Sequence, residues 1–181
     1  MEVEHFYYKE MYPNLVVEWN NLLACCKRCN TAKGRHDVGI EPIVNPTTDD
    51  PRVHLSLRNY RFYPKTQIGK TTRDVLNLND QQRAVQARFA VGELMANYSE
   101  ELEEIAVKYT NNPTSRLRNK TSNKLEGALK EAAPEAQFGS TAATELKSNV
   151  NFSNAISILR STDVWTPEIE KSYQCCIAIS Y

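Results

Sequence analysis

The sequence predicts an α+β fold that is mainly helical, with short strands near the N-terminus and helices over most of the remaining chain. Residues 3–8 and 22–25 are short β-branched, aromatic and apolar runs separated by a Pro-Asn loop signal, which is typical of two strands. Apolar residues then recur at helical spacing from residue 85 to residue 105. We therefore expect a strand–strand–helix unit over 1–60 and a helical scaffold and partner-binding region over 61–181.

The first unit is expected to begin with a strand over 3–8, in which Glu4 and His5 alternate in direction. Both side chains can reach one site only if the strand ends or bulges there. A second strand over 22–25 precedes a helix that is predicted to begin near Asn30, to run through Lys33 and to stop at Gly34.

The second region is expected to begin with a long helix capped by Asn79 or Asp80 and ending near Tyr109. Its inward stripe is predicted to comprise Val85, Phe89, Leu94, Met95, Tyr98, Leu102 and Ile105. Residues 114–135 are polar and indicate an exposed helix or a partly mobile segment. One or two helices are expected over 142–160, and Thr166 with Pro167 marks a further helix start.

Composition limits the classes of protein to which the chain can belong. It has 181 residues, of which 41% are apolar, which suffices for a core, and no run is long enough to cross a membrane. The acidic start lacks the basic region of a signal peptide, and five cysteines without a regular framework favour a reducing cytoplasm. We therefore expect a cytoplasmic protein with no membrane partner.

The charge distribution favours a local nucleic-acid contact although the net charge is zero. Residues 26–75 contain ten Lys or Arg and five Asp or Glu, a balance of +5, which is suited to phosphate contacts. The alternative interpretation of this segment is an ordinary solvent-exposed surface of mixed charge. The chain has no Gly-x-x-x-x-Gly-Lys-Ser/Thr phosphate loop, so any ATPase with which it works is a separate polypeptide.

The first thirty residues contain the most specific chemical pattern. Glu4-His5 lies sixteen residues ahead of Asn21 and is followed by the Cys26-x-x-Cys29-Asn30 sequence. Carboxylate and amide oxygens can hold a hard divalent cation, and an imidazole titrates near neutrality, as phosphodiester hydrolysis requires. Taken singly, these residues have other interpretations. A Glu-His pair is typical of a protein surface, and the two asparagines are typical of turns or helix caps. The two cysteines are also typical of a zinc knuckle or of buried thiols.

Taken together, this pattern with Lys9, Trp19 and Lys33 resembles the HNH (ββα-metal) nuclease motif. More narrowly, it resembles the PtuB-like subunit of Septu-type and retron-associated anti-phage defence systems. The likeness continues through the Asp-Pro and His-Leu segment at 50–55 and the Leu-x-Leu-Asn-like segment at 76–79. It covers about the first half of the chain.

The resemblance implies a role for each matching residue. His5 would be the general base, Glu4 and Asn30 would hold Mg²⁺ or Mn²⁺, and Asn21 would hold the loop and orient the base. The basic side chains around the motif would contact nucleic acid; these are Lys9, Arg28, Lys33 and Arg35. Glu4 stands where many HNH nucleases have Asp.

A zinc site at Cys26 and Cys29 is the less favoured expectation, because the sequence shows no upstream Cys-x-x-Cys to complete four thiolates. The partners implied are DNA, a separate PtuA-like ATPase and, in retron systems, a reverse transcriptase with its RNA–DNA product. The alternative function is a non-catalytic zinc-knuckle module that binds nucleic acid or serves as a scaffold.

Overall fold

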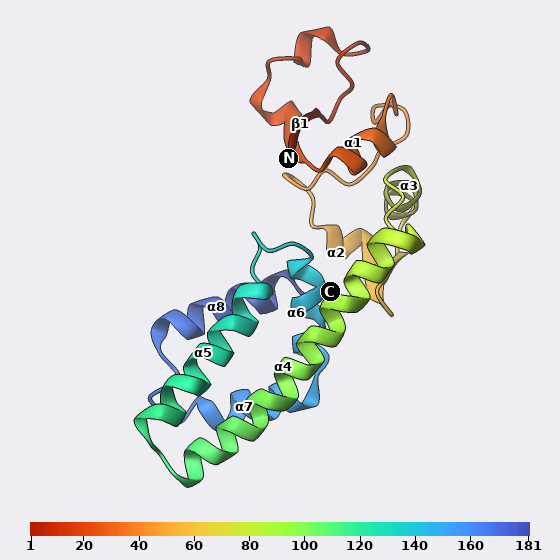
Figure 1. Ribbon diagram of the computed structural model, residues 1–181. Helices are drawn as coiled ribbons and strands as arrows, with labels where there is room; N and C mark the ends of the chain where they lie inside the picture. Colours follow the sequence, from red (N-terminus) through yellow and green to blue (C-terminus); the bar gives the residue numbers. More distant parts are fainter. The chain divides into compact units, whose positions relative to one another are not determined.

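The computed structural model describes residues 1–181, which divide into two compact units, Met1–Val85 and Gln86–Tyr181 (Figure 1). Two small antiparallel sheets and a majority of helical residues confirm the predicted α+β, mainly helical class. The division falls after residue 85, whereas the sequence suggested residue 60, because the β-hairpin that spans residue 60 and the helix that follows it pack within the first unit.

The first unit opens with the elements that surround the sequence motif. Strand β1 (Glu2–His5) pairs antiparallel with β2 (Leu22–Cys25), and His5 lies opposite Leu22 at the end of the ladder. Helix α1 (Lys27–Lys33) follows and ends at Gly34, whose φ of 50° is readily adopted by glycine. The helix begins earlier than predicted because the Cys26 sulfur caps it by accepting a hydrogen bond from the Cys29 amide at 3.3 Å.

The rest of the first unit is a hairpin packed against a helix. Its elements are α2 (Pro51–His54), β3 (Leu55–Arg58), β4 (Arg61–Pro64), α3 (Gln67–Val75) and a π-helical turn (Gln81–Val85). Two short 3₁₀ turns, Pro13–Leu15 and Trp19–Asn21, lie in the loop between β1 and β2. A Cβ added at Gly69 of α3 would lie 2.0 Å from the His54 carbonyl oxygen, so only glycine allows this approach.

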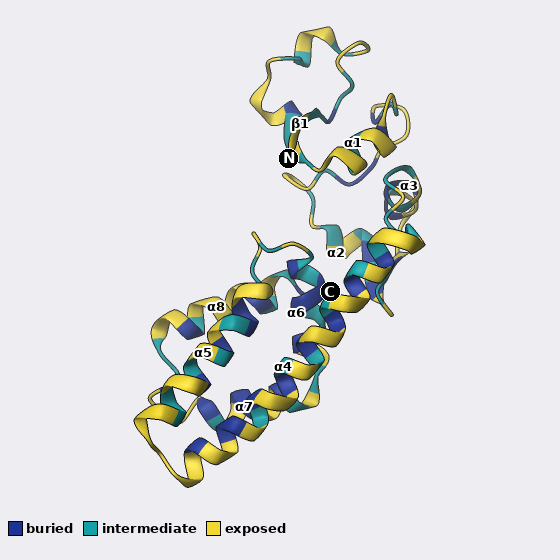
Figure 2. Ribbon diagram, viewed as in Figure 1, coloured by how far each residue is buried: buried dark blue, intermediate teal, exposed yellow.

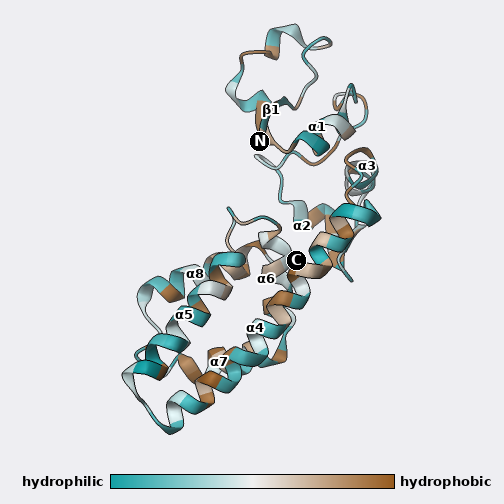
Figure 3. Cartoon of the chain, in the orientation of Figure 1, coloured by the Kyte–Doolittle hydropathy of each residue, from teal (hydrophilic) through white to brown (hydrophobic).

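The second unit is a bundle of five helices. These are α4 (Gln86–Asn111), α5 (Ser115–Glu131), α6 (Gly139–Ser148), α7 (Val150–Leu159) and α8 (Pro167–Ile179). Helix α4 packs on α5, α6 and α7, while α8 packs on α5 and α6. Figures 2 and 3 show the buried, apolar positions recurring along α4 among exposed, polar ones. The core is made of apolar side chains such as Met95, Leu102, Leu125, Leu146 and Leu159.

Most helices match their predictions, with differences in which side chains point inward. Phe89 and Leu94, expected on the buried stripe of α4, are 51% and 41% exposed. The polar stretch after residue 114 forms one continuous helix, α5, which buries one face in the core through Leu125, Ala128 and Leu129. The Thr166 hydroxyl caps α8 as predicted by accepting from the Ile169 amide.

A polar cluster joins three segments of the bundle. The Tyr109 hydroxyl of α4 donates to the Asp163 carboxylate, and Arg118 Nε of α5 donates to the same carboxylate at 2.7 Å. The Tyr109 hydroxyl, followed by Arg118, holds the pKa of Asp163 below its usual range.

None of the helices combines the length and apolar character needed to cross a membrane.

Candidate functional site

Strand β1 and helix α1 face each other, and each expected metal ligand contacts the opposite element. Glu2 and Glu4 lie two residues apart in the strand and so share one face, while Asn30 and Lys33 share one face of the helix. Asn30 Nδ2 donates to Glu2 Oε2 at 2.9 Å, and Lys33 Nζ donates to Glu4 Oε1 at 2.6 Å. Glu4 and Asn30 therefore belong to one polar cluster between the two elements.

The donor chemistry of this cluster fits a hard divalent cation. Asn30 uses its amide nitrogen on Glu2, which leaves its Oδ1 without a protein hydrogen bond, and Glu4 contacts Lys33 through one carboxylate oxygen. Oxygen ligands of this kind suit Mg²⁺ or Mn²⁺. No group of three or more His, Cys, Asp or Glu side chains is placed to hold a metal, so water and substrate oxygens would complete the coordination.

Lys33 occupies a different position from the phosphate-contacting one that the sequence suggested. It is only 5% exposed, and its ammonium also donates to the His5 carbonyl at 2.8 Å. The ammonium thus offsets the charge of Glu4 and fixes the end of β1 where the chain leaves the strand. Lys33 is therefore a buried member of the cluster that holds Glu4 and the His5 backbone in place.

The His5 ring is held at the end of β1 by the loop that follows. Its Nε2 lies 3.1 Å from the Val16 carbonyl oxygen. Because a carbonyl can only accept, Nε2 must bear the hydrogen, and the neutral ring then keeps its lone pair on Nδ1. The geometry assigns Nδ1 as the nitrogen of His5 that is able to accept a proton.

Asn21 closes this loop with its whole side-chain amide. It is 3% exposed; its Oδ1 accepts from the Tyr7 amide at 2.6 Å, and its Nδ2 donates to the Tyr7 and Leu15 carbonyls at 3.2 and 2.9 Å. The Phe6 amide also donates to the Asn21 carbonyl at 2.9 Å. These bonds hold the segment directly after His5 against the segment that binds the His5 ring, as a loop-holding role requires.

The thiols at the start of α1 differ in character. The hydrogen bond from the Cys29 amide is the main cause that lowers the pKa of the exposed Cys26 thiol. Burial, followed by the hydrogen bond to Cys26, raises the pKa of Cys29 to about 12. Burial also raises the pKa of Cys25. Of these three thiols, Cys26 is therefore the one that ionises most readily.

The remaining basic candidates lie on the surface near these elements. Lys9 and Arg28 are exposed, and Arg35 pairs loosely with Glu10 at 3.7 Å. Sequence reasoning did not single out Glu2 or the Val16 carbonyl. Residues two apart in a strand point to the same side, so the place of Glu2 beside Glu4 could have been predicted from the sequence. No side-chain pattern predicts the contact of a backbone carbonyl such as that of Val16.

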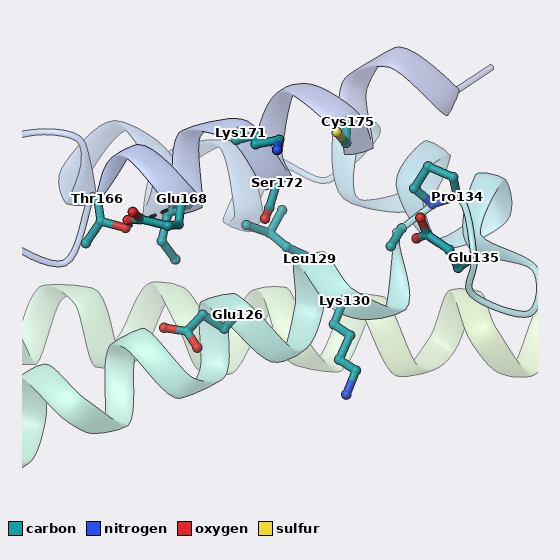
Figure 4. A pocket seen from close by; sticks show the side chains of 12 residues that line it. Glu126, Leu129, Lys130, Pro134, Glu135, Thr166, Glu168, Lys171, Ser172 and Cys175 are labelled. Carbon is teal, nitrogen blue, oxygen red and sulfur yellow. Dashed lines mark hydrogen bonds between the residues drawn. The ribbon is translucent and has the colours of Figure 1, made fainter.

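The second unit has a cleft between α5 and α8 with a volume of about 780 Å³. Figure 4 shows that Leu129 and Ser172 point into it from the two helices and that charged side chains surround it. None of the residues expected to take part in catalysis, metal binding or nucleic-acid contact lines this cleft. The candidate site is therefore confined to the first unit.

Comparison with known proteins identifies the family. The chain is 41% identical over 173 residues to the Septu protein PtuB of Bacillus thuringiensis, which covers 94% of this chain and 67% of that protein. No protein-family model matches the chain. No solved structure matches it either. The identity and coverage extend well beyond the motif into the helical unit, and the chain therefore belongs to the PtuB family of Septu proteins.

Proposed function

We propose that this chain acts in Septu anti-phage defence as a metal-dependent endonuclease of the HNH type, which hydrolyses phosphodiester bonds of DNA. Membership of the PtuB family supports the defence role. The observation that carries the nuclease proposal is the cluster in which Glu4 and Asn30 lie between β1 and α1 while His5 is fixed at the end of the same strand.

The contacts of each residue suggest its role in this reaction. Glu4 and Asn30 would hold Mg²⁺ or Mn²⁺, which when bound supplies positive charge to the scissile phosphate. His5 accepts a proton from the attacking water at Nδ1, because Nε2 is occupied by the Val16 carbonyl. Asn21 keeps the His5 loop in place.

Lys33 takes the part of a positioning residue in this scheme. Its bonds to Glu4 and to the His5 carbonyl link the metal-binding strand position to the position that carries the base. A fixed separation between a metal ligand and a general base is a requirement of this chemistry, since small displacements lower the rate strongly. The internal ammonium meets that requirement without contacting substrate.

The proposal includes a separate ATPase partner of the PtuA type. The family name supports this pairing, and the chain itself contains no nucleotide phosphate loop. In this scheme the partner supplies ATP-dependent control and the present chain supplies the site for phosphodiester hydrolysis. A retron reverse transcriptase with its RNA–DNA product is a further proposed partner.

The deciding experiment is cleavage of supercoiled plasmid with Mg²⁺ or Mn²⁺, with the chain alone and with its ATPase. His5→Ala is expected to abolish cutting. His36→Ala is the matched control, because His36 Nε2 also lies against a backbone carbonyl, that of Glu41 at 2.7 Å, outside the cluster. Equal cutting by wild type and His5→Ala would refute the assignment of the base.

The alternative is a non-catalytic module in which Cys26 and Cys29 hold zinc. It predicts stoichiometric zinc by elemental analysis and no metal-dependent cutting under any condition. Cutting that requires Mg²⁺ or Mn²⁺ and is lost in His5→Ala would reject that module.

A further inference from the structure

The tip of the β3–β4 hairpin presents two arginines that no carboxylate neutralises. Arg58 and Arg61 are directly opposed in the strand register. The arginines that form ion pairs lie elsewhere, at Arg35, Arg52, Arg73, Arg118 and Arg160. Arg61 donates only to the Asn59 carbonyl, at 3.4 Å. The outer face of the hairpin therefore holds two adjacent, uncompensated positive charges.

This arrangement is unfavourable for the isolated fold. Like charges directly opposite each other across an antiparallel pair are destabilising. The turn that joins them places Asn59 and Tyr60 at φ values of 47° and 61°, and a tyrosine rarely adopts the left-handed region. A bound anion between the guanidinium groups would offset the repulsion.

The hairpin is also held rigidly, as a binding element requires. Leu57 and Phe62 are buried on its inner face, and the Asn79 side chain bonds both to the Phe62 amide, at 2.8 Å, and to its carbonyl, at 2.9 Å. On the outer face the Arg58 guanidinium lies 4.7 Å from the centre of the Tyr63 ring. Stacking on the ring fixes the guanidinium plane and leaves its N–H edge available to an anion.

We propose that Arg58 and Arg61 form a phosphate-binding site for the backbone of a nucleic acid. The proposal rests on the proposed function, because it supplies that nuclease with a substrate contact on a second element of the first unit. Two adjacent guanidinium groups, one of them stacked on Tyr63, suit the oxygen pairs of backbone phosphates. The exposed, aromatic Tyr63 beside them suits an unpaired strand.

Binding can be measured without cutting, by fluorescence anisotropy of the full chain with EDTA present. The probes are single-stranded DNA and RNA of one sequence and about 20 nucleotides, titrated between about 50 and 200 mM salt. The double variant Arg58→Gln/Arg61→Gln is compared with Arg116→Gln/Lys120→Gln, which removes the same charge from exposed positions of α5. Circular dichroism checks that both variants are folded.

The hairpin variant is expected to bind both probes about tenfold more weakly at 0.1 M salt and to reduce the salt slope by about 1.4, the value for two lost phosphate contacts on a single strand. The control is expected to change affinity less than twofold. Unchanged affinity and slope, an equal loss in the control, or a loss confined to one probe would overturn the proposal.

The two proposals can fail separately. Wild-type binding in the hairpin variant, together with plasmid cutting that depends on His5, would remove the hairpin site and leave the nuclease standing. Weakened binding in that variant, with no cutting by wild type under any metal or partner condition, would do the reverse.

Discussion

Replacing Lys33 with methionine is expected to destabilise the first unit by about 3 kcal/mol, which lies within the range for breaking a buried ion pair. The ammonium makes two short, charge-assisted hydrogen bonds, to Glu4 at 2.6 Å and to the His5 carbonyl at 2.8 Å. With the side chains of Lys33 and Glu4 only 4% and 13% exposed, water cannot fully replace the lost partner. A loss of this size raises the opening equilibrium constant roughly 150-fold.

Native-state hydrogen exchange of the amides paired between β1 and β2 measures that opening directly. Arg35→Met is the control, because the Arg35–Glu10 pair is 3.7 Å apart with side chains 76% and 57% exposed, and its loss should change stability by less than about 0.5 kcal/mol. Adding Glu4→Gln to Lys33→Met should restore part of the stability by removing the unpaired carboxylate. If Lys33→Met costs no more than the control, the interior role argued for Lys33 is refuted.

Three further outcomes are expected. Gly69→Ala should lower the thermal midpoint sharply because its Cβ would meet α2 backbone, whereas Gly127→Ala, with nothing within 4 Å, should stabilise α5 by about 1 kcal/mol; equal midpoints would contradict this. Iodoacetamide should modify Cys26 before Cys29 in peptide mapping, since the pKa of Cys26 is lowered and that of Cys29 is raised to about 12; the reverse order would refute the assigned thiol environments. A tyrosine hydroxyl and an arginine lower the pKa of Asp163, so its stabilisation is present above the ordinary Asp pKa and is lost as pH falls through the folded value; Asp163→Asn should weaken this acid dependence of melting, and an unchanged dependence would count against it.

Local signals were sufficient to predict several elements of this fold from the sequence. The second strand over 22–25, the stop at Gly34 and the cap at Thr166 each depend on residues within a few positions of one another. The first strand was predicted to extend to residue 8, but it ends at His5 because the following amides turn to bond Asn21. That end depends on a partner far along the chain, which no local pattern contains.

In the candidate site, too, the features that depend on local sequence were predicted and those that depend on tertiary packing were not. The spacing of the motif named Glu4, Asn30, His5 and Asn21, and the structure brings Glu4 and Asn30 into one polar cluster while Asn21 closes the loop that holds His5. The burial of Lys33 could not be predicted, because a lysine near a basic segment normally reaches solvent. Only the packing of α1 against β1 places a carboxylate and a carbonyl around its ammonium.

The pairing of Arg58 with Arg61 across the hairpin could not be predicted for a related reason, and it changes how the neutral net charge should be interpreted. A net charge of zero weighs against nucleic-acid binding only if each positive charge has a negative neighbour. In the first unit Lys33, Arg35 and Arg52 do have such neighbours, whereas Arg58 and Arg61 lie side by side with none. The field that a phosphate meets within a Debye length is set by such local pairing. A neutral chain can therefore present a strongly positive element, and the salt dependence of binding will reveal it where net charge does not.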